Sequence, residues 1–94
     1  MKTLPPDATP YHRTAEFTEL TTPAALRREH TTKAGTWARI CVVSGSLRYR
    51  ILGAAPDEQV LTPDCPGVVE PEVPHQVEPL GAVRFFVEFL RRRE

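Results

Sequence analysis

Two stretches of the chain alternate apolar and polar residues with a period of two, which is the spacing of a β-strand. In residues 47–52, Leu47, Tyr49 and Ile51 fall on one face and arginines fall on the other. Residues 83–90 repeat the pattern, with valine and phenylalanine sharing one face. Both stretches are therefore predicted to be strands with one buried face.

A third apolar run, Trp37–Val43, is separated from residues 47–52 by Ser44-Gly45-Ser46. A glycine between two strand-like runs predicts a tight hairpin turn. Residues 23–29 have some helical character but run straight into His30-Thr31-Thr32, so we predict a strand there, with a helical turn as the alternative. Shorter strand candidates are residues 16–20, 59–62, 68–70 and 76–78.

Ten prolines in 94 residues argue against a helical protein, because proline breaks helix interiors. About eight short strands with closely spaced turn signals indicate a single all-β domain, a small sandwich or barrel. We expect residues 1–14 to form an N-terminal arm, residues 15–91 the barrel, and residues 92–94 a charged tail.

Charge and composition exclude several classes of protein. Lys plus Arg and Asp plus Glu are both 12, so no net field draws the chain to nucleic acid or to an anionic membrane. No apolar run approaches the roughly 18 residues of a membrane helix, and the N-terminus lacks the apolar centre of a secretion signal. Two cysteines make no disulfide framework. We expect a cytoplasmic protein with no nucleic-acid or membrane partner.

The histidines carry the most chemistry. His30 and His75 each stand where a predicted strand meets a turn, whereas His12 is predicted to be a surface residue of the arm. Prolines on both sides of His75 hold the backbone extended, so the ring loses little entropy on becoming a ligand. A histidine at a strand end is also a common hydrogen-bonded structural group, and the ring alone does not decide between these roles.

Two blocks of sequence carry a resemblance to a known family. They are HTTKAGTWARICVVSGSLRYRIL, residues 30–52, and PGVVEPEVPHQVEPLGAVRFFVEF, residues 66–89. Their order resembles the cupin superfamily, and within it the small TehB/YeaR-like domains linked by name to tellurite resistance. The resemblance implies a cupin-like double-stranded β-barrel, or jelly roll.

The resemblance carries over only part of a metal site. Typical metal-binding cupins have two histidines two residues apart and then a glutamate, whereas here His30 is followed by Thr32, and Trp37 or its neighbour stands near the glutamate position. The second motif usually has a glycine before its histidine, where this chain has Glu72. Only His30 and His75 carry over as ligands, so a bound metal needs an oxygen donor from elsewhere.

Glu88 is the first candidate for that donor, because it interrupts an apolar strand and resembles an acidic position of the subfamily; Glu72 and Glu70 follow. Two imidazoles and one carboxylate suit zinc or a divalent iron- or manganese-type ion. The alternative is that Glu88 faces water, which removes the carboxylate from the site. We favour the pocket-facing orientation because Phe86 and Leu90 make that face partly apolar.

Other residues are candidates for ligand binding. Arg39 and Lys33 could steer a small anionic molecule toward the pocket, and Trp37 and Tyr49 could form its wall. For Arg39 the alternative is a cross-strand neighbour on a solvent face, and for Trp37 a core anchor.

Two functions follow. The first is a metal-binding site for a small molecule or oxyanion, enzymatic or sensory, related by resemblance to tellurite or oxyanion stress. The second is a non-catalytic binding or interaction module without a functional metal. There is neither a Gly-rich cofactor loop nor a nucleophile–base arrangement, so methyl transfer is not expected and enzymatic activity stays open. A homodimer formed through a sheet edge is expected.

Overall fold

The structure is a computed structural model that describes residues 1–92. Strands make up 51% of the chain and helix 4%, which confirms the all-β prediction for a single small domain. The elements in the described part are β1 (Ala8–Arg13), β2 (Phe17–Thr18), α1 (Ala24–Arg27), β3 (Thr36–Ser44), β4 (Leu47–Ile51), β5 (Asp57–Leu61), β6 (Gly67–Val69), β7 (His75–Pro79) and β8 (Arg84–Arg92).

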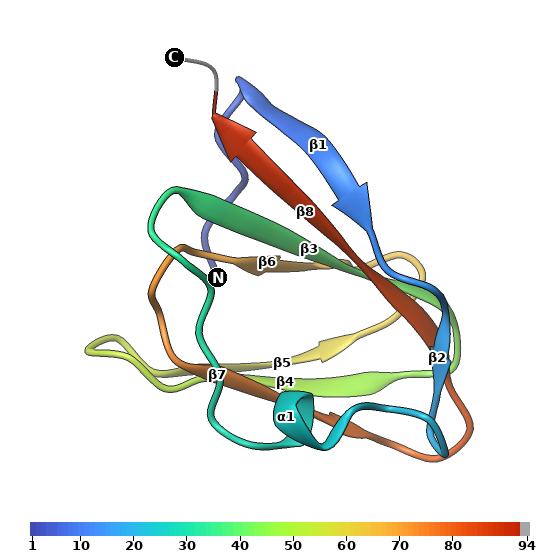
Figure 1. The fold of residues 1–94 in the computed structure, drawn as a ribbon. Coiled ribbons are helices and arrows are strands. Elements are labelled where there is room, and N and C mark those ends of the chain that lie inside the picture. The colour runs from blue at the N-terminus through green and yellow to red at the C-terminus, as the bar shows by residue number, and fades with distance from the viewer. Residues whose placement is uncertain (93–94) are drawn as a thin grey trace.

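The strands form two antiparallel sheets that face each other (Figure 1). The first has the order β1-β8-β3-β6, with β2 beside the start of β8, and the second has the order β5-β4-β7. In the part of the chain that the structure describes, the two sheets do not close into a barrel. The predicted jelly roll therefore remains a prediction.

The core lies between the sheets and follows the predicted alternation. In β4, Leu47, Tyr49 and Ile51 are buried and the two arginines between them are half-buried. In β3, Ala38 and Ile40 point inward in the same way. Because successive side chains of a strand point to opposite faces, these strands present one apolar face to the core.

The Ser44-Gly45-Ser46 turn does not make the predicted hairpin. β3 pairs with β6 and β8, whereas β4 pairs with β5 and β7, so the turn carries the chain from one sheet to the other. Gly45 has a φ of 79°, and a Cβ atom there would collide with the carbonyl oxygen of Ala82. Glycine is needed here for a left-handed backbone and a close approach between chains, not for hairpin register.

Within residues 23–29, Ala24–Arg27 form the helical turn that was the alternative, and the predicted strand is wrong. Pro23 stands at the N-cap of α1 with a φ of −57°, and the N–H of Leu26 donates to its carbonyl oxygen at 3.0 Å. Proline fixes its own φ, and alanine and leucine have high helix propensity, so local preference explains the turn.

Within residues 1–92, no helix is both long and apolar enough to cross a membrane.

Six residues of the predicted N-terminal arm belong to a sheet. Residues 8–13 form β1, which pairs with β8 from Ala8 opposite Arg92 to Arg13 opposite Glu88. At the other end of the chain, Arg92 belongs to β8, and residues 93–94 of the predicted charged tail lie outside the described residues.

Candidate functional site

His30 and His75 lie directly opposite each other. Each backbone N–H donates to the carbonyl oxygen of the other residue, both at 2.8 Å, in an isolated antiparallel bridge. Residues paired in this way place their side chains on the same side, and the two ring centres are 5.3 Å apart with an interplanar angle of 77°. Two imidazoles that are distant in sequence therefore meet at one place.

His75 is buried, with 5% of its surface exposed. Its Nδ1 lies 3.0 Å from the carbonyl oxygen of Val73. A carbonyl oxygen only accepts, so Nδ1 carries the proton and donates, which leaves a lone pair on Nε2. Burial lowers the pKa of His75; the Val73 hydrogen bond opposes that shift, and the nearby His30 adds to it. The buried ring is thus favoured in its neutral form, with Nε2 able to accept a hydrogen bond or bind a metal.

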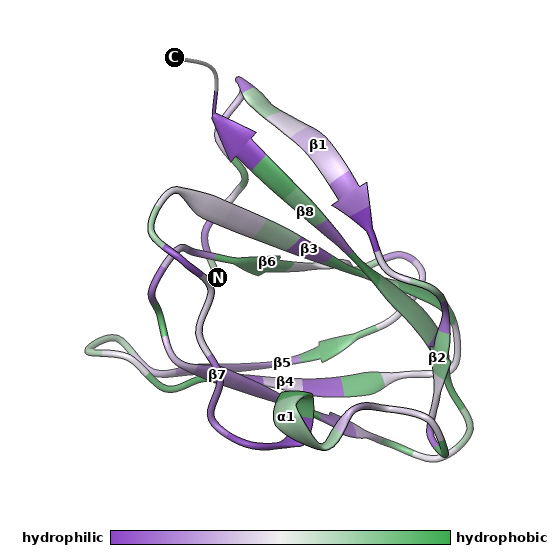
Figure 2. Cartoon of the chain, in the orientation of Figure 1, coloured by the Kyte–Doolittle hydropathy of each residue, from purple (hydrophilic) through white to green (hydrophobic). Residues whose placement is uncertain are grey.

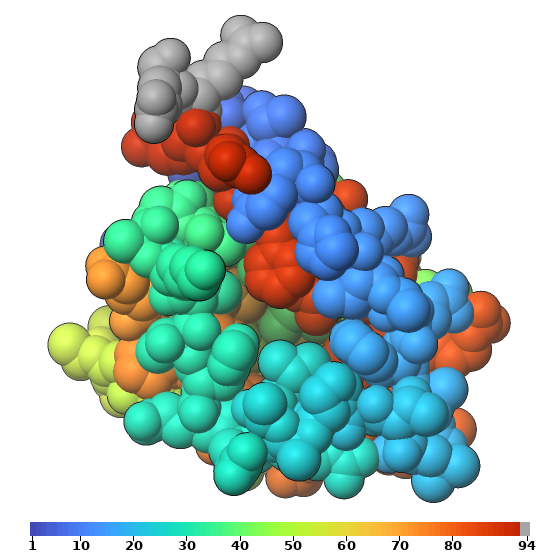
Figure 3. All heavy atoms as spheres, viewed as in Figure 1, coloured from blue at the N-terminus to red at the C-terminus, as the bar shows by residue number. Residues whose placement is uncertain are grey.

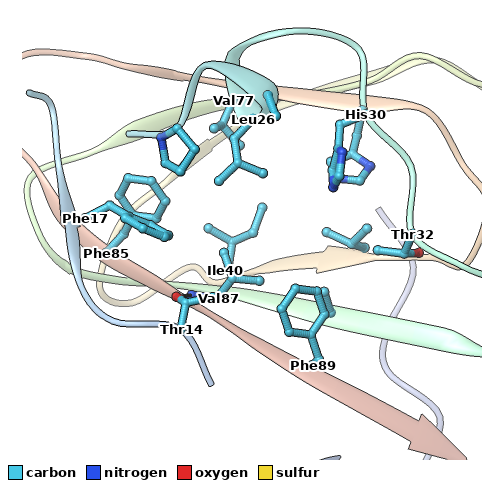
Figure 4. A pocket seen from close by; sticks show the side chains of 15 residues that line it. Thr14, Phe17, Leu26, His30, Thr32, Ile40, Val77, Phe85, Val87 and Phe89 are labelled. Atoms are coloured by element: carbon cyan, nitrogen blue, oxygen red, sulfur yellow. Dashed lines mark hydrogen bonds between the residues drawn. The ribbon is translucent and has the colours of Figure 1, made fainter. Parts of the chain in front are cut away.

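Beside the two rings lies a cavity of about 210 Å³. His30 and Thr32 stand at one end, whereas Phe17 and Phe85 lie at the opposite end (Figure 4). The Thr32 hydroxyl donates to the carbonyl oxygen of Thr36 at 2.8 Å. The lining is otherwise almost entirely apolar and consists of Thr14, Phe17, Pro23, Ala25, Leu26, His30, Thr32, Ala38, Ile40, Val69, His75, Val77, Phe85, Val87 and Phe89.

One wall of the cavity comes from residues 14–32, which cross the opening between the sheets. Figure 2 shows α1 in the colours of apolar residues and the loop after it in the colours of polar ones. The start of this segment is held by Thr14, whose N–H donates to the carbonyl oxygen of Val87 at 2.9 Å, and its end is held by the bridge between His30 and His75. The segment is therefore fixed on both sides of α1.

Glu88 does not reach this cavity. It lies opposite Arg39 in the pairing of β3 with β8 and forms an ion pair with it, with 18% of its side chain exposed. Its neighbours Val87 and Phe89 line the cavity, so alternation turns Glu88 to the outer face of the sheet. The favoured pocket-facing orientation is therefore wrong: Glu88 lies on the outer face of the sheet, where it is paired with Arg39 and is only partly exposed to water.

The apolar residues Phe86 and Leu90 were the reason for predicting that Glu88 faces the pocket, and the structure shows what covers them instead. The guanidinium group of Arg13 stacks over the ring of Phe86 at 3.7 Å, and Leu90 is buried opposite Trp37. These contacts cover the apolar side chains on the outer face of the sheet.

The residues present supply two imidazoles for a metal ion but no carboxylate. Among residues 1–92, no group of three His, Cys, Asp or Glu side chains could hold a metal. Glu70 pairs with Lys2 at 3.4 Å, and Glu72 is an exposed residue whose N–H donates to the carbonyl oxygen of Thr32. Neither lines the cavity. The predicted ligand set of His30, His75 and a glutamate is therefore not assembled.

Of the predicted ligand-binding residues, some lie away from the cavity and one lies beside it. Arg39 is on the outer face, and its hydrogen bond with Glu88 raises the pKa of its guanidinium group. Trp37 lines a different hollow, together with Tyr11 and Arg91. Lys33, by contrast, lines a hollow that adjoins the cavity.

Tyr49 supports the site from behind. Its ring centre lies 6.0 Å from that of His75, and its hydroxyl donates to the carbonyl oxygen of Val68 at 2.9 Å. Burial raises the pKa of Tyr49, so the hydroxyl keeps its proton. Tyr49 therefore packs against the imidazole but does not line the cavity.

Sequence reasoning missed the residues that close the cavity. Phe17 and Leu26 pack against the core from residues 14–32, where no periodic pattern marks them. Phe89 was placed on the buried face of its strand, and that alternation was the available signal for its contribution.

Comparisons with known proteins identify the family of this chain. The sequence matches the model of the TehB-like domain over residues 12–87. The chain belongs to the TehB-like domain family. The predicted resemblance to TehB-like domains is thus confirmed.

Two solved structures are similar to the domain. TehB from Haemophilus influenzae is 27% identical with a TM-score of 0.83, over 93% of this chain and 32% of that one, so this domain spans about a third of its length. A protein from E. coli strain K12 is 23% identical with a TM-score of 0.86 and is covered completely in both chains; at that identity it shows the fold alone. No curated protein matches the sequence.

Proposed function

We propose that this TehB-like domain binds a small, largely apolar molecule in the cavity between its sheets, with His30 and His75 as its polar recognition groups. The observation that carries the proposal is the pair of adjacent imidazoles in an otherwise apolar cavity. Ligand sites are typically apolar pockets with a few converging polar groups.

The size of the cavity supports a ligand of about the size of a substituted benzene. An apolar cavity of about 150 Å³ is large enough for benzene, and this one measures about 210 Å³. A ligand of about eight non-hydrogen atoms, at roughly 0.7 kcal/mol each, would bind with a Kd near 0.1 mM.

The polar end of the cavity offers one hydrogen-bond acceptor to a ligand. Nδ1 of His75 is used by the carbonyl oxygen of Val73, which leaves Nε2 as an acceptor. A ligand hydroxyl or amide N–H directed at this ring would satisfy it. A bare oxyanion such as tellurite is a poor match to the cavity, because an unpaired charge is costly to bury among apolar side chains.

A second candidate is a metal ion held by the two imidazoles and completed by oxygen ligands of a bound molecule. Metal–nitrogen bonds of about 2.0–2.1 Å place the ring centres of two imidazoles on one tetrahedral ion roughly 5 Å apart, and the observed separation is 5.3 Å. The hydrogen bond from Nδ1 to a backbone carbonyl is also the usual way in which proteins orient a metal-binding histidine.

We also propose that the fold is a cupin-type sandwich. Two antiparallel sheets that face each other, with both histidines in contact with the space between them, support that assignment. Zinc or another first-row ion remains the metal to test, since neutral imidazoles suit these ions.

A cavity-filling variant tests the main proposal. Ala38 is buried and lines the cavity, whereas Val43 lies on the same strand but is exposed. Titration with 3-phenylpropan-1-ol, followed by NMR, should give saturable binding to the wild type. Ala38→Leu should weaken that binding at least tenfold, and Val43→Leu should leave it unchanged.

Equal binding by Ala38→Leu and the wild type, or no binding by either, would overturn the proposal. Metal analysis of chelator-free wild type, His30→Ala and His75→Ala tests the second candidate. Stoichiometric metal that is lost in both variants supports a two-histidine metal site, whereas metal-free wild-type protein contradicts it.

A further inference from the structure

The cavity adjoins a second, more polar hollow. The two share His30, Thr32 and Phe89, and the outer hollow is completed by Tyr11, His12, Thr31, Lys33 and Thr36. Figure 3 shows a depression on this face of the molecule, between the blue N-terminal strands and the teal segment around α1, with red atoms of β8 beside it. The two hollows therefore lie against each other at His30 and Phe89.

The residues that line the outer hollow include Lys33 but no Asp or Glu, and Glu72, which carries a carboxylate, is bonded through its backbone to Thr32 at the rim. Lys33 is exposed and forms no ion pair within the described residues, unlike Arg39, Arg48, Arg50, Arg84 and Arg92. His12, which stacks on Phe89 with ring centres 5.9 Å apart, adds ring nitrogens beside it. Because the whole chain has equal numbers of acidic and basic residues, this excess of positive charge is local.

A neighbouring hollow extends the positive region. It shares Tyr11 and Thr36 with the hollow around Lys33, and the guanidinium group of Arg91 lies 3.9 Å from the centre of the Tyr11 ring. Arg92 also lines it but is paired with Asp7 at 3.0 Å. Charges of one sign around an opening raise the local concentration of oppositely charged ligands.

We propose that the ligand of this domain is a small amphipathic carboxylate, whose apolar body occupies the cavity and whose carboxylate lies at Lys33. This inference rests on the proposed function, because it assumes that the cavity is the binding site. The arrangement separates the ligand's two parts: the apolar part leaves water, whereas the charged part stays at an exposed lysine and keeps most of its hydration. The high cost of burying an ion is thereby avoided.

The site requires a ligand with one charge at one end. The cavity lining contains no Lys, Arg, Asp or Glu, so a second charge on the apolar body would have no partner. Aryl-alkyl or branched alkyl monocarboxylates meet this requirement, and inorganic oxyanions do not.

The test compares 3-phenylpropanoate with its neutral counterpart 3-phenylpropan-1-ol, which has the same aryl body. The wild type should bind the carboxylate about two- to fivefold more tightly, which is the range of an exposed ion pair. Lys33→Met should abolish this preference and leave binding of the alcohol unchanged, and Lys33→Arg should retain it. Arg50→Met, which removes a charge from the outer face of the other sheet, is the matched control and should retain the preference.

Two further measurements use the same probes. Raising the salt concentration should reduce the preference for the carboxylate, because exposed charges are screened. Glu72→Gln removes a carboxylate from a residue bonded to Thr32 at this rim and should strengthen binding of 3-phenylpropanoate slightly.

The outcomes separate the two proposals. If the alcohol binds but the carboxylate gains nothing, or if the gain survives Lys33→Met, the amphipathic carboxylate is wrong and the apolar binding site stands. If neither probe binds the wild type, the proposed function fails, and this inference fails with it.

Discussion

Acid should destabilise this domain through His75, and a single substitution should remove that sensitivity. The imidazole is buried and its pKa lies below the ordinary value of 6.5, chiefly because of burial. Between the two pKa values the unfolded chain binds a proton that the folded protein does not. Stability is therefore lost as pH falls through 6.5 and stops changing through this group below the folded-state pKa.

The size of the effect has an upper limit set by one proton. Between pH 7.0 and 5.5 an unfolded pKa of 6.5 allows a loss of at most about 1.3 kcal/mol, reached if the folded ring stays neutral throughout. For a domain of this length, that limit corresponds to roughly 5–10 °C in Tm.

Urea unfolding followed by the fluorescence of Trp37, at several pH values between 5.5 and 8, measures this loss. The wild type should lose more stability on acidification than His75→Gln does, and the difference should lie within the limit above. His12→Gln replaces an exposed histidine and should keep the wild-type dependence. Parallel profiles for the wild type and His75→Gln, or a wild type that gains relative stability in acid, would refute the description of His75 as a buried neutral ring.

Three further predictions concern other positions. Gly45→Ala should lower the free energy of unfolding in urea by about 2–5 kcal/mol, since it combines a left-handed φ with a backbone collision. Gly81→Ala, whose Cβ would meet nothing, should lower it by only about 1–2 kcal/mol. Equal losses would contradict the close approach at Gly45. Tyr49→Phe should cost about 1 kcal/mol, because it removes a buried hydroxyl that donates to a backbone carbonyl; an unchanged urea midpoint would argue against that bond. Glu88→Gln should cost under about 1 kcal/mol and leave binding of 3-phenylpropan-1-ol within twofold of wild type; a larger loss of binding would mean that the carboxylate contributes to the site.

Local alternation predicted the strands well, because the buried face of a strand carries apolar residues at every second position of its own sequence. Leu47, Tyr49 and Ile51 were assigned to one face, and that face is the core. The partner of each strand is a non-local property, however. The turn at Gly45 has the composition of a hairpin, yet the chain crosses there to the other sheet, and the collision that demands glycine involves residues far along the sequence.

The orientation of Glu88 failed for a related reason. Both faces of its strand are partly apolar, and the sequence does not reveal that Phe86 is covered by Arg13 and not by the core. The ion pair with Arg39 lies on this covered outer surface. Apolar content alone could not distinguish a cavity from a covered outer surface.

Glu72, which stands where a glycine is usual in the second cupin motif, has an unusual backbone conformation. This residue has a φ of 62°, a left-handed conformation that costs residues with a side chain about 1–2 kcal/mol. Glycine adopts it freely, which is consistent with the glycine expected before the histidine in the second cupin motif. Here the backbone conformation is present although the residue differs.

The most direct measurement of the central claim is a set of intermolecular NOEs between the aryl protons of 3-phenylpropan-1-ol and the methyl groups of the labelled protein. The cavity lined by Ile40, Val87 and Leu26 predicts NOEs to these three residues, with shifts of the His30 and His75 ring resonances at the same ligand concentration. NOEs confined to exposed methyls such as those of Leu20 or Val60, with unchanged histidine resonances, would contradict it.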